Sequence, residues 1–263
     1  MTHPAYGVLR PVTESASVLL CDNPGPLTLD GTNTWVLAAP GSTELVVVDP
    51  GPDEPEHIDR IAGLGEILGA RISLVLISHR HGDHTDGIDR LVDATGATVR
   101  SVGSGFLRGL GGHLRDGEVI EAAGLRIEVL ATPGHTRDSV SFVLEDAVLT
   151  ADTVLGRGTA VIDAEDGSLA DYLESLRRLR DLGPRRVLPG HGPELDDLTA
   201  VTEMYLAHRQ ERLEQVRRAL QTLGEDATAR QVVEHVYADV DQKLWDAAES
   251  SVRAQLDYLR PPP

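Results

Sequence analysis

The stretch "LVLISHRHGDHTDG", residues 74–87, joins an apolar run to a cluster of histidines and aspartates. Residues 72–77 are apolar apart from one serine, and a run of that length predicts a buried strand of an α/β sheet. His79, His81, Asp83 and His84 follow that run within six residues. Open α/β folds place their ligand sites just past the carboxyl ends of strands. The stretch therefore predicts a functional site at the end of this strand.

Composition limits the class of protein. The chain has 263 residues, a formal net charge of −18 and 41% hydrophobic residues. This length suits one large domain, or a large domain with a small one. The acidic balance argues against strong nonspecific nucleic-acid binding, which needs a basic surface. Cys21 is the only cysteine, so we expect neither a disulfide framework nor a zinc site built from thiolates.

The sequence shows no sign of membrane insertion or export. The first twenty residues lack a basic start followed by a long apolar run, and no segment reaches 18 uninterrupted apolar residues. We therefore expect no secretory signal, no membrane span and a cytoplasmic location. The oligomeric state stays open, with a homodimer among the alternatives.

The dipeptide Pro-Gly recurs after apolar runs, at 50–51, 133–134 and 189–190. Such turns end strands and project the next side chain from the edge of a sheet. Two of them lead directly to a histidine, His135 and His191, and Asp152 follows another apolar run.

Strand-like runs and helical stretches alternate through the first three quarters of the chain. The predicted strands lie at 34–38, 45–49, 72–77, 97–102, 125–130, 139–144, 147–150 and 186–188. The predicted helices lie at about 54–68, 84–94 and 168–181. With a hairpin at 139–150, this order predicts an α/β fold with mixed sheets.

The pattern becomes entirely helical from residue 198. Leu213, Val216, Leu220 and Leu223 form a helical stripe, and Thr228 with Gln231 makes a capping box for a second helix. A third helix follows around Val252. The sequence thus predicts a domain at 1–197 and a small helical unit at 198–263.

The predicted strand ends together supply seven side chains of the type that binds metal: His79, His81, Asp83, His84, His135, Asp152 and His191. Burying that many ionisable groups close together is costly without a metal. Seven nitrogen and oxygen ligands are too many for one tetrahedral zinc, but they fit two metals that share a bridging carboxylate.

This pattern, HxHxDH followed by His, Asp and His, resembles the metallo-β-lactamase superfamily. The resemblance implies an αββα sandwich. It also implies one metal on His79, His81 and His135, a second on Asp83, His84 and His191, and Asp152 as the bridge. Asp49 in "VVVDPG" matches the aspartate that supports the site from behind the ligands, although a turn-capping role is an equal alternative.

Further motifs, such as "NPGPLTLDGTNTWVL" and "PGHTRDSVSF", resemble the beta-lactamase-like-protein-2 group. Its members add a winged-helix-like domain after the hydrolase, and some are endoribonucleases that act on single-stranded RNA. The chain stops directly after the third helix, so we expect the β-wing to be missing. That expectation weakens a nucleic-acid role for the tail and favours a lid or a dimerisation element.

The expected chemistry is hydrolysis. A metal pair lowers the pKa of bound water from 15.7 to roughly 7 and holds a bridging hydroxide. Asp83 and Asp152 also offset the charge of two dications, which gives them a catalytic role beyond geometry. Zinc suits this donor set, and manganese or iron are alternatives.

The sequence leaves the substrate open. The first hypothesis is a single-stranded RNA endonuclease, and the second is a thioesterase or lactonase that acts on a small metabolite, as glyoxalase II does. A β-lactamase fits less well, and a metal-containing regulatory protein is the alternative outside the enzymes. Residues 32–34 and the loop "GRGT" at 156–159 are candidates for lining the pocket.

Overall fold

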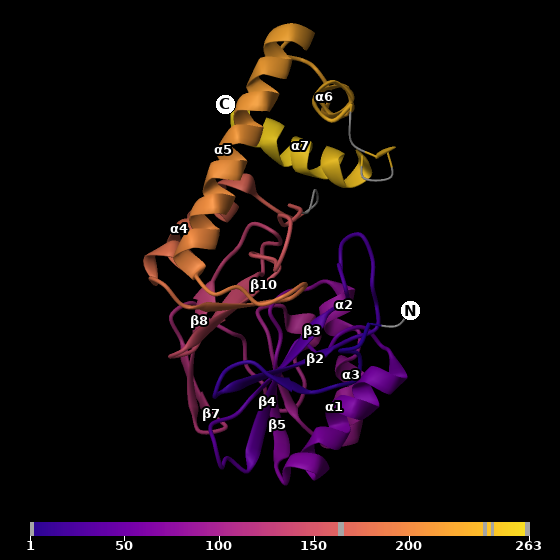
Figure 1. Ribbon diagram of the computed structural model, residues 1–263, viewed down its shortest axis with the longest axis vertical. Coiled ribbons are helices and arrows are strands. Elements are labelled where there is room, and N and C mark those ends of the chain that lie inside the picture. Colours follow the sequence, from indigo (N-terminus) through magenta and orange to yellow (C-terminus); the bar gives the residue numbers. More distant parts are fainter. Residues whose placement is uncertain (1–2, 163–165, 239–240, 243–244, 261–263) are drawn as a thin grey trace.

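The computed structural model describes residues 3–162, 166–238, 241–242 and 245–260. Two β-sheets lie against each other, and a long helix rises from them into a helical tail (Figure 1). In spatial order, the first sheet consists of β1 (Arg10–Pro11), β2 (Ala16–Leu20), β3 (Asn33–Leu37), β4 (Glu44–Val48), β5 (Arg71–Leu76) and β6 (Thr98–Arg100). The second consists of β11 (Arg186–Pro189), β10 (Ala147–Ala151), β9 (Val140–Val143), β8 (Leu125–Ala131) and β7 (Val119–Ala122).

Both sheets are mixed, as predicted. The pairs β4–β5, β5–β6 and β10–β11 are parallel, and the other neighbours are antiparallel. The predicted hairpin at 139–150 is the antiparallel pair β9–β10. The helices are α1 (Pro55–Leu68), α2 (Gly82–Thr85), α3 (Ile88–Thr95), the 3₁₀ turn η1 (Ser104–Phe106), α4 (Leu169–Asp181), α5 (Leu198–Leu223), α6 (Ala229–Val236) and α7 (Trp245–Leu259).

The alternation of side chains along β4 explains the layers. Val46 and Val48 point into the core between the sheets, whereas Leu45 and Val47 point outward and pack with α1 and α3. Successive residues of a strand face opposite sides of its sheet, so a fully buried strand needs cover on both sides. On the second sheet, α4 and α5 supply that cover. The expected αββα sandwich is therefore confirmed.

Helix α5 belongs to two cores. Its first half, with Val201 and Tyr205, packs with α4 against the second sheet. Its second half, from Val216 onward, packs with α6 and α7 in a separate small core. Among the described residues after β11, the tail contains helices and no strand.

Two features differ from the sequence prediction. The predicted helix at 84–94 is two helices, α2 and α3, because the turn around Gly87 packs closely against Ile58 of α1 and the backbone of Gly51. Strands β1, β2 and β7 are not predicted by the sequence; β1 has two residues, and β7 keeps two of its four side chains exposed.

No helix among the described residues is both long and apolar enough to cross a membrane.

The topology brings five strand ends to one edge of the sandwich. β4 leads to Asp49, β5 to His79, β8 to His135, β10 to Asp152 and β11 to His191. Segments distant in the sequence thus deliver polar side chains to one place.

Gly134 controls how closely α4 approaches the turn that carries His135. Its φ is 137°, and an added Cβ would lie 2.3 Å from Cα of Tyr172 in α4. A side chain of any size would therefore separate α4 from this turn.

We expect Gly134→Ala to lower the free energy of unfolding by about 3 kcal/mol, from backbone strain and overpacking. Gly69→Ala is the matched control: Gly69 also has a positive φ, 64°, but its Cβ would meet nothing within 4 Å. It should cost only about 1 kcal/mol. Urea unfolding of both variants checks this, and equal losses would contradict the packing argument.

Candidate metal centre

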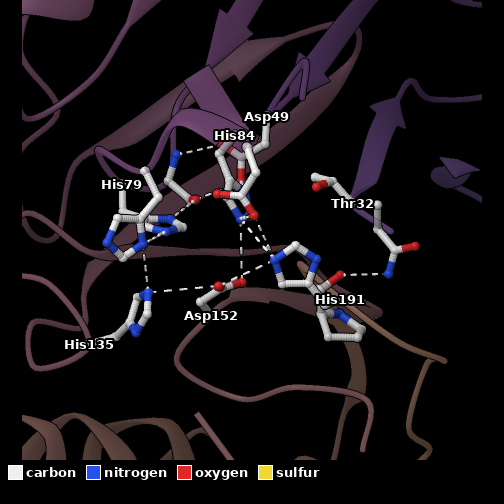
Figure 2. A network of polar contacts seen from close by, with 12 residues as sticks. Thr32, Asp49, His79, His84, His135, Asp152 and His191 are labelled. Atoms are coloured by element: carbon white, nitrogen blue, oxygen red, sulfur yellow. Dashed lines mark hydrogen bonds and ion pairs between the residues drawn. The ribbon is translucent and has the colours of Figure 1, made fainter. Parts of the chain in front are cut away.

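The seven side chains predicted as metal ligands gather in one cluster at the edge where the strand ends meet. Figure 2 shows His79, His84, His135, Asp152 and His191 arranged around a common centre. His81, Asp83 and His84 come from the loop and short helix α2 that follow β5. Six of the seven side chains supply donor atoms to two groups that could each hold a cation. The first is His79, His81 and His135, and the second is Asp83, His84 and His191.

The first group consists of three imidazoles. Nδ1 of His81 lies 3.0 Å from Nε2 of His79 and 3.0 Å from Nε2 of His135. One nitrogen of His81 can share only one proton, so it cannot satisfy both neighbours by hydrogen bonding. A cation between the three nitrogens would satisfy all of them.

The second group combines two imidazoles with a carboxylate. Nε2 of His191 lies 3.3 Å from Nε2 of His84 and 3.2 Å from Oδ2 of Asp83. Nε2 of His84 lies 3.7 Å from the same Asp83 oxygen. His84 and His191 are fully buried, whereas Asp83 faces the surface in part.

Asp152 lies between the groups. Its Oδ2 is 3.7 Å from Nε2 of His135 in the first group and 3.4 Å from Nε2 of His191 in the second. Its Oδ1 is 3.5 Å from Nε2 of His84. In this position Asp152 could contact a cation held by either group.

Hydrogen bonds on the far side of each ring orient the imidazoles. Nδ1 of His135 donates to the carbonyl of Val161 at 2.5 Å, and Nδ1 of His191 donates to the carbonyl of Gly31 at 3.1 Å. A proton fixed on Nδ1 leaves the lone pair of Nε2 directed at the cluster.

Asp49 does the same for His79 and His84. Its Oδ2 accepts from the hydroxyl of Ser78 at 2.6 Å and contacts Nδ1 of His84 at 2.9 Å, while its Oδ1 accepts from the Ser78 amide at 2.8 Å. Because the Ser78 hydroxyl donates to Asp49, Nδ1 of His79 donates to that hydroxyl, at 2.9 Å. Asp49 thus orients two histidines, directly or through Ser78.

The backbone of Asp49 is held in an unusual conformation, with φ at 54°. Its carbonyl accepts from the hydroxyl of Thr34 at 2.8 Å, and Nε2 of His57 lies 2.9 Å from the same hydroxyl. Such positions persist only where the surroundings impose them, and they occur often at functional sites.

The residues present fit a pair of cations. Oδ1 of Asp152 is buried and has no hydrogen-bond partner among the described residues. Gly190 packs over it, and an added Cβ would lie 2.5 Å from that oxygen. A buried carboxylate oxygen without a hydrogen bond, surrounded by imidazole nitrogens, is suited to a metal.

Electrostatics distinguish the two groups. Burial holds the pKa of His79 well below its usual range and also lowers the pKa of His135. Burial also disfavours the charged form of His84 and His191, but nearby carboxylates together outweigh it. Asp152 and Asp49 raise the pKa of His84 well above its usual range, and Asp152 and Asp83 raise that of His191 to about 9. The neighbouring carboxylates thus favour the protonated form of these two rings.

A cavity of about 680 Å³ opens beside the cluster, and His81, Asp83, His135, Asp152 and His191 line its floor. The loop at 156–159 lines it as predicted, through Arg157, Gly158 and Thr159. Residues 32–34 do not line it. They lie behind the cluster, where Asn33 donates to the carbonyls of Pro189 and Gly192 and holds the His191 turn.

Sequence reasoning anticipated Asp49 but missed the other groups that orient the rings. Ser78 had a local signal, because it directly precedes the HxHxDH motif. The carbonyls of Gly31 and Val161 had none, since any residue supplies a carbonyl and only the fold brings it to a histidine.

Asp49→Asn tests the orienting role of Asp49. An amide has one acceptor end, so the variant loses either the Ser78 or the His84 contact. We expect metal affinity to fall by about 10- to 100-fold, measured by competition with a chelator. Asp53→Asn is the control, because Asp53 is an exposed carboxylate paired with Arg90. The metal affinity of this variant should equal that of the parent. Parent-like affinity in Asp49→Asn would contradict the role.

Metal uptake should release protons, because ligand histidines must be neutral. Near pH 7.5 we expect His84 and His191 to release protons when metal binds, and the contribution of His191 to fall as the pH rises through 9. Calorimetric titration in buffers of different ionisation enthalpy measures the number of protons released. His191→Asn should reduce it by about one, and binding without proton release would show that the rings are neutral beforehand.

Comparisons with known proteins agree with this geometry. Residues 27–191 match the metallo-beta-lactamase superfamily, and residues 228–260 match the beta-lactamase associated winged helix domain. The chain is 31% identical over 261 residues to "Beta-lactamase-like protein 2 homolog" of Caenorhabditis elegans, covering 95% of this chain and 86% of that protein.

Solved structures show the same fold. A metallo-beta-lactamase family protein of Thermus thermophilus superposes with a TM-score of 0.77 and 25% identity, covering 94% of each chain. A second structure, TTHA1623 in a di-iron-bound form, has a TM-score of 0.55 and 27% identity, covering 66% of this chain and 92% of that one.

The family and the donor groups together imply divalent metal ions. The chain therefore belongs to the metallo-beta-lactamase superfamily and is a metal-dependent hydrolase with a C-terminal winged helix domain.

Proposed function

We propose that the protein hydrolyses an ester or thioester of a small metabolite that carries an apolar acyl group. The cavity above the metal cluster carries this proposal. Its walls are largely apolar and include Pro26, Leu27, Leu29, Leu155, Ala160 and Val161. Apolar walls favour substrates whose binding buries hydrocarbon.

The small number of basic side chains in the cavity also favours an uncharged acyl substrate. Arg157 is the one arginine or lysine among the described residues that line it, and no phenylalanine, tyrosine or tryptophan is among them. The guanidinium of Arg157 already contacts both carboxylate oxygens of Asp30, at 2.6 and 2.8 Å. Single-stranded nucleic acid is usually bound by a basic groove with aromatic side chains for stacking. Such a groove is not formed by these residues.

Two cations bound by the seven ligands would supply Lewis acidity and a water activated near neutral pH. The chain's own residues prepare the site for them. His84 and His191 outweigh the effect of burial and hold the pKa of Asp152 well below its usual range. Asp152 therefore stays ionised and offsets the charge of the cations. We propose zinc for the site, with iron or manganese as alternatives for this donor set.

Single-stranded RNA cleavage is the second candidate. Similarity to the beta-lactamase-like protein 2 group over 95% of the chain and the winged helix match at 228–260 support it. The tail is less favourable for RNA binding, because three of its arginines are paired with carboxylates. Arg217 pairs with Glu214, Arg230 with Glu234, and Arg253 with Glu249.

One experiment compares the candidates. Protein loaded with zinc or manganese is assayed on acyl-N-acetylcysteamine thioesters of increasing chain length and on labelled single-stranded RNA. We expect thioester hydrolysis, with kcat/KM rising up to about fourfold for each added CH₂ that the cavity buries. RNA should remain intact.

Variants show whether the activity belongs to the cluster. His81→Ala and Asp83→Ala should each lose activity by roughly a hundredfold or more. His113→Ala, at an exposed histidine outside the cluster, is the control. Internal RNA cleavage that His81→Ala abolishes would replace the first candidate by the second. No turnover of either substrate by metal-loaded protein would refute both.

A further inference from the structure

Arg209 is a buried cation that the chemistry above does not use. It lies on α5, in the part that covers the second sheet, and only 3% of its surface is exposed. Its Nε has no hydrogen-bond partner among the described residues. Burying a guanidinium without satisfying it costs free energy. Stability alone therefore does not account for an arginine at this position.

The guanidinium reaches the wall of the cavity. It donates a hydrogen bond to the carbonyl of Ala160. The next residue, Val161, supplies the carbonyl that accepts from Nδ1 of His135. Arg209 therefore anchors the peptide directly before the group that orients a ligand of the first cation.

A second contact leads toward Asp152. The guanidinium carbon of Arg209 lies 4.9 Å from the ring centre of Tyr172 on α4, within the range of a cation–π interaction. The Tyr172 hydroxyl donates to the carbonyl of Thr153 at 2.7 Å, and Thr153 directly follows Asp152. Arg209 thus also supports the side chain that holds the segment beside the bridging carboxylate.

Tyr205 strengthens the same arrangement from the preceding turn of α5. Its hydroxyl accepts from the amide of Leu155 at 3.0 Å and lies 3.3 Å from the carbonyl of the same residue. Residues four apart share one face of a helix, so Tyr205 and Arg209 both hydrogen-bond the segment at 155–160.

We propose that Arg209 is a positioning residue, which sets the geometry of the metal ligands His135 and Asp152 through the cavity wall. Helix α5 thereby connects the helical tail to the metal centre. The inference rests on the metal centre described above, and it does not depend on whether the substrate is a thioester or RNA.

The test measures Co²⁺ binding to the full chain, by chelator competition and by the visible absorption spectrum. Arg209→Met keeps the length and apolar stem but loses the hydrogen bond to Ala160. We expect Co²⁺ affinity at least about tenfold weaker and an altered spectrum. Arg209→Lys retains a donor within reach of the wall and should recover part of the affinity. Arg217→Met, at a half-buried arginine on the same helix, should resemble the parent.

Three results would overturn the proposal. They are a Co²⁺ affinity of Arg209→Met within twofold of the parent, equal losses in the Met and Lys variants, and a parent that binds no Co²⁺. The last result would remove the metal centre itself, whereas failure to hydrolyse thioesters would leave these readouts intact. If Arg209→Met does not fold, Tyr172→Phe decides, because it removes only the hydroxyl that donates to Thr153. Unchanged affinity and spectrum in that variant would refute the route from Arg209 through Tyr172 to Asp152.

Discussion

The structure depends on holding seven imidazole and carboxylate side chains together at one edge of a β-sandwich, several of them fully buried. Such a cluster is unfavourable unless each ring is fixed and its charge compensated. The fold does both. Backbone carbonyls of Gly31 and Val161, together with Asp49 and Ser78, fix four histidines from behind. The donor atoms that remain point inward, toward positions that suit two cations.

The support extends well beyond the ligands. Behind Asp49, the Thr34 hydroxyl and His57 hold a backbone with positive φ. Behind His135, the wall of the cavity rests on Arg209 of α5. Metal sites are tuned by groups that contact the ligands rather than the metal, and here those groups come from both sheets and from the tail helix. The helical tail is thus joined to the centre through the same helix that covers the second sheet.

The cluster and the cavity have different consequences for function. The cluster is the part that identifies the chain as a metal-dependent hydrolase of its superfamily. The chemistry of such a centre suits several substrates, so the choice among them belongs to the cavity. Leu27, Leu155 and Val161 present hydrocarbon there, and Arg157 is neutralised by Asp30. These features support an uncharged acyl substrate over a polyanion.

Local sequence patterns determined much of this protein. Apolar runs and Pro-Gly turns predicted most strands, and the HxHxDH spacing with His135, Asp152 and His191 identified the candidate cluster, because strand periodicity and turn chemistry are local properties. Tertiary structure alone decided the rest. The acceptor of His191, the approach of Arg209 to Ala160 and the sharing of α5 between two cores each join segments far apart in the chain. Such contacts depend on how sheets and helices pack, and a carbonyl or a buried arginine carries no local signal of the partner that it will meet.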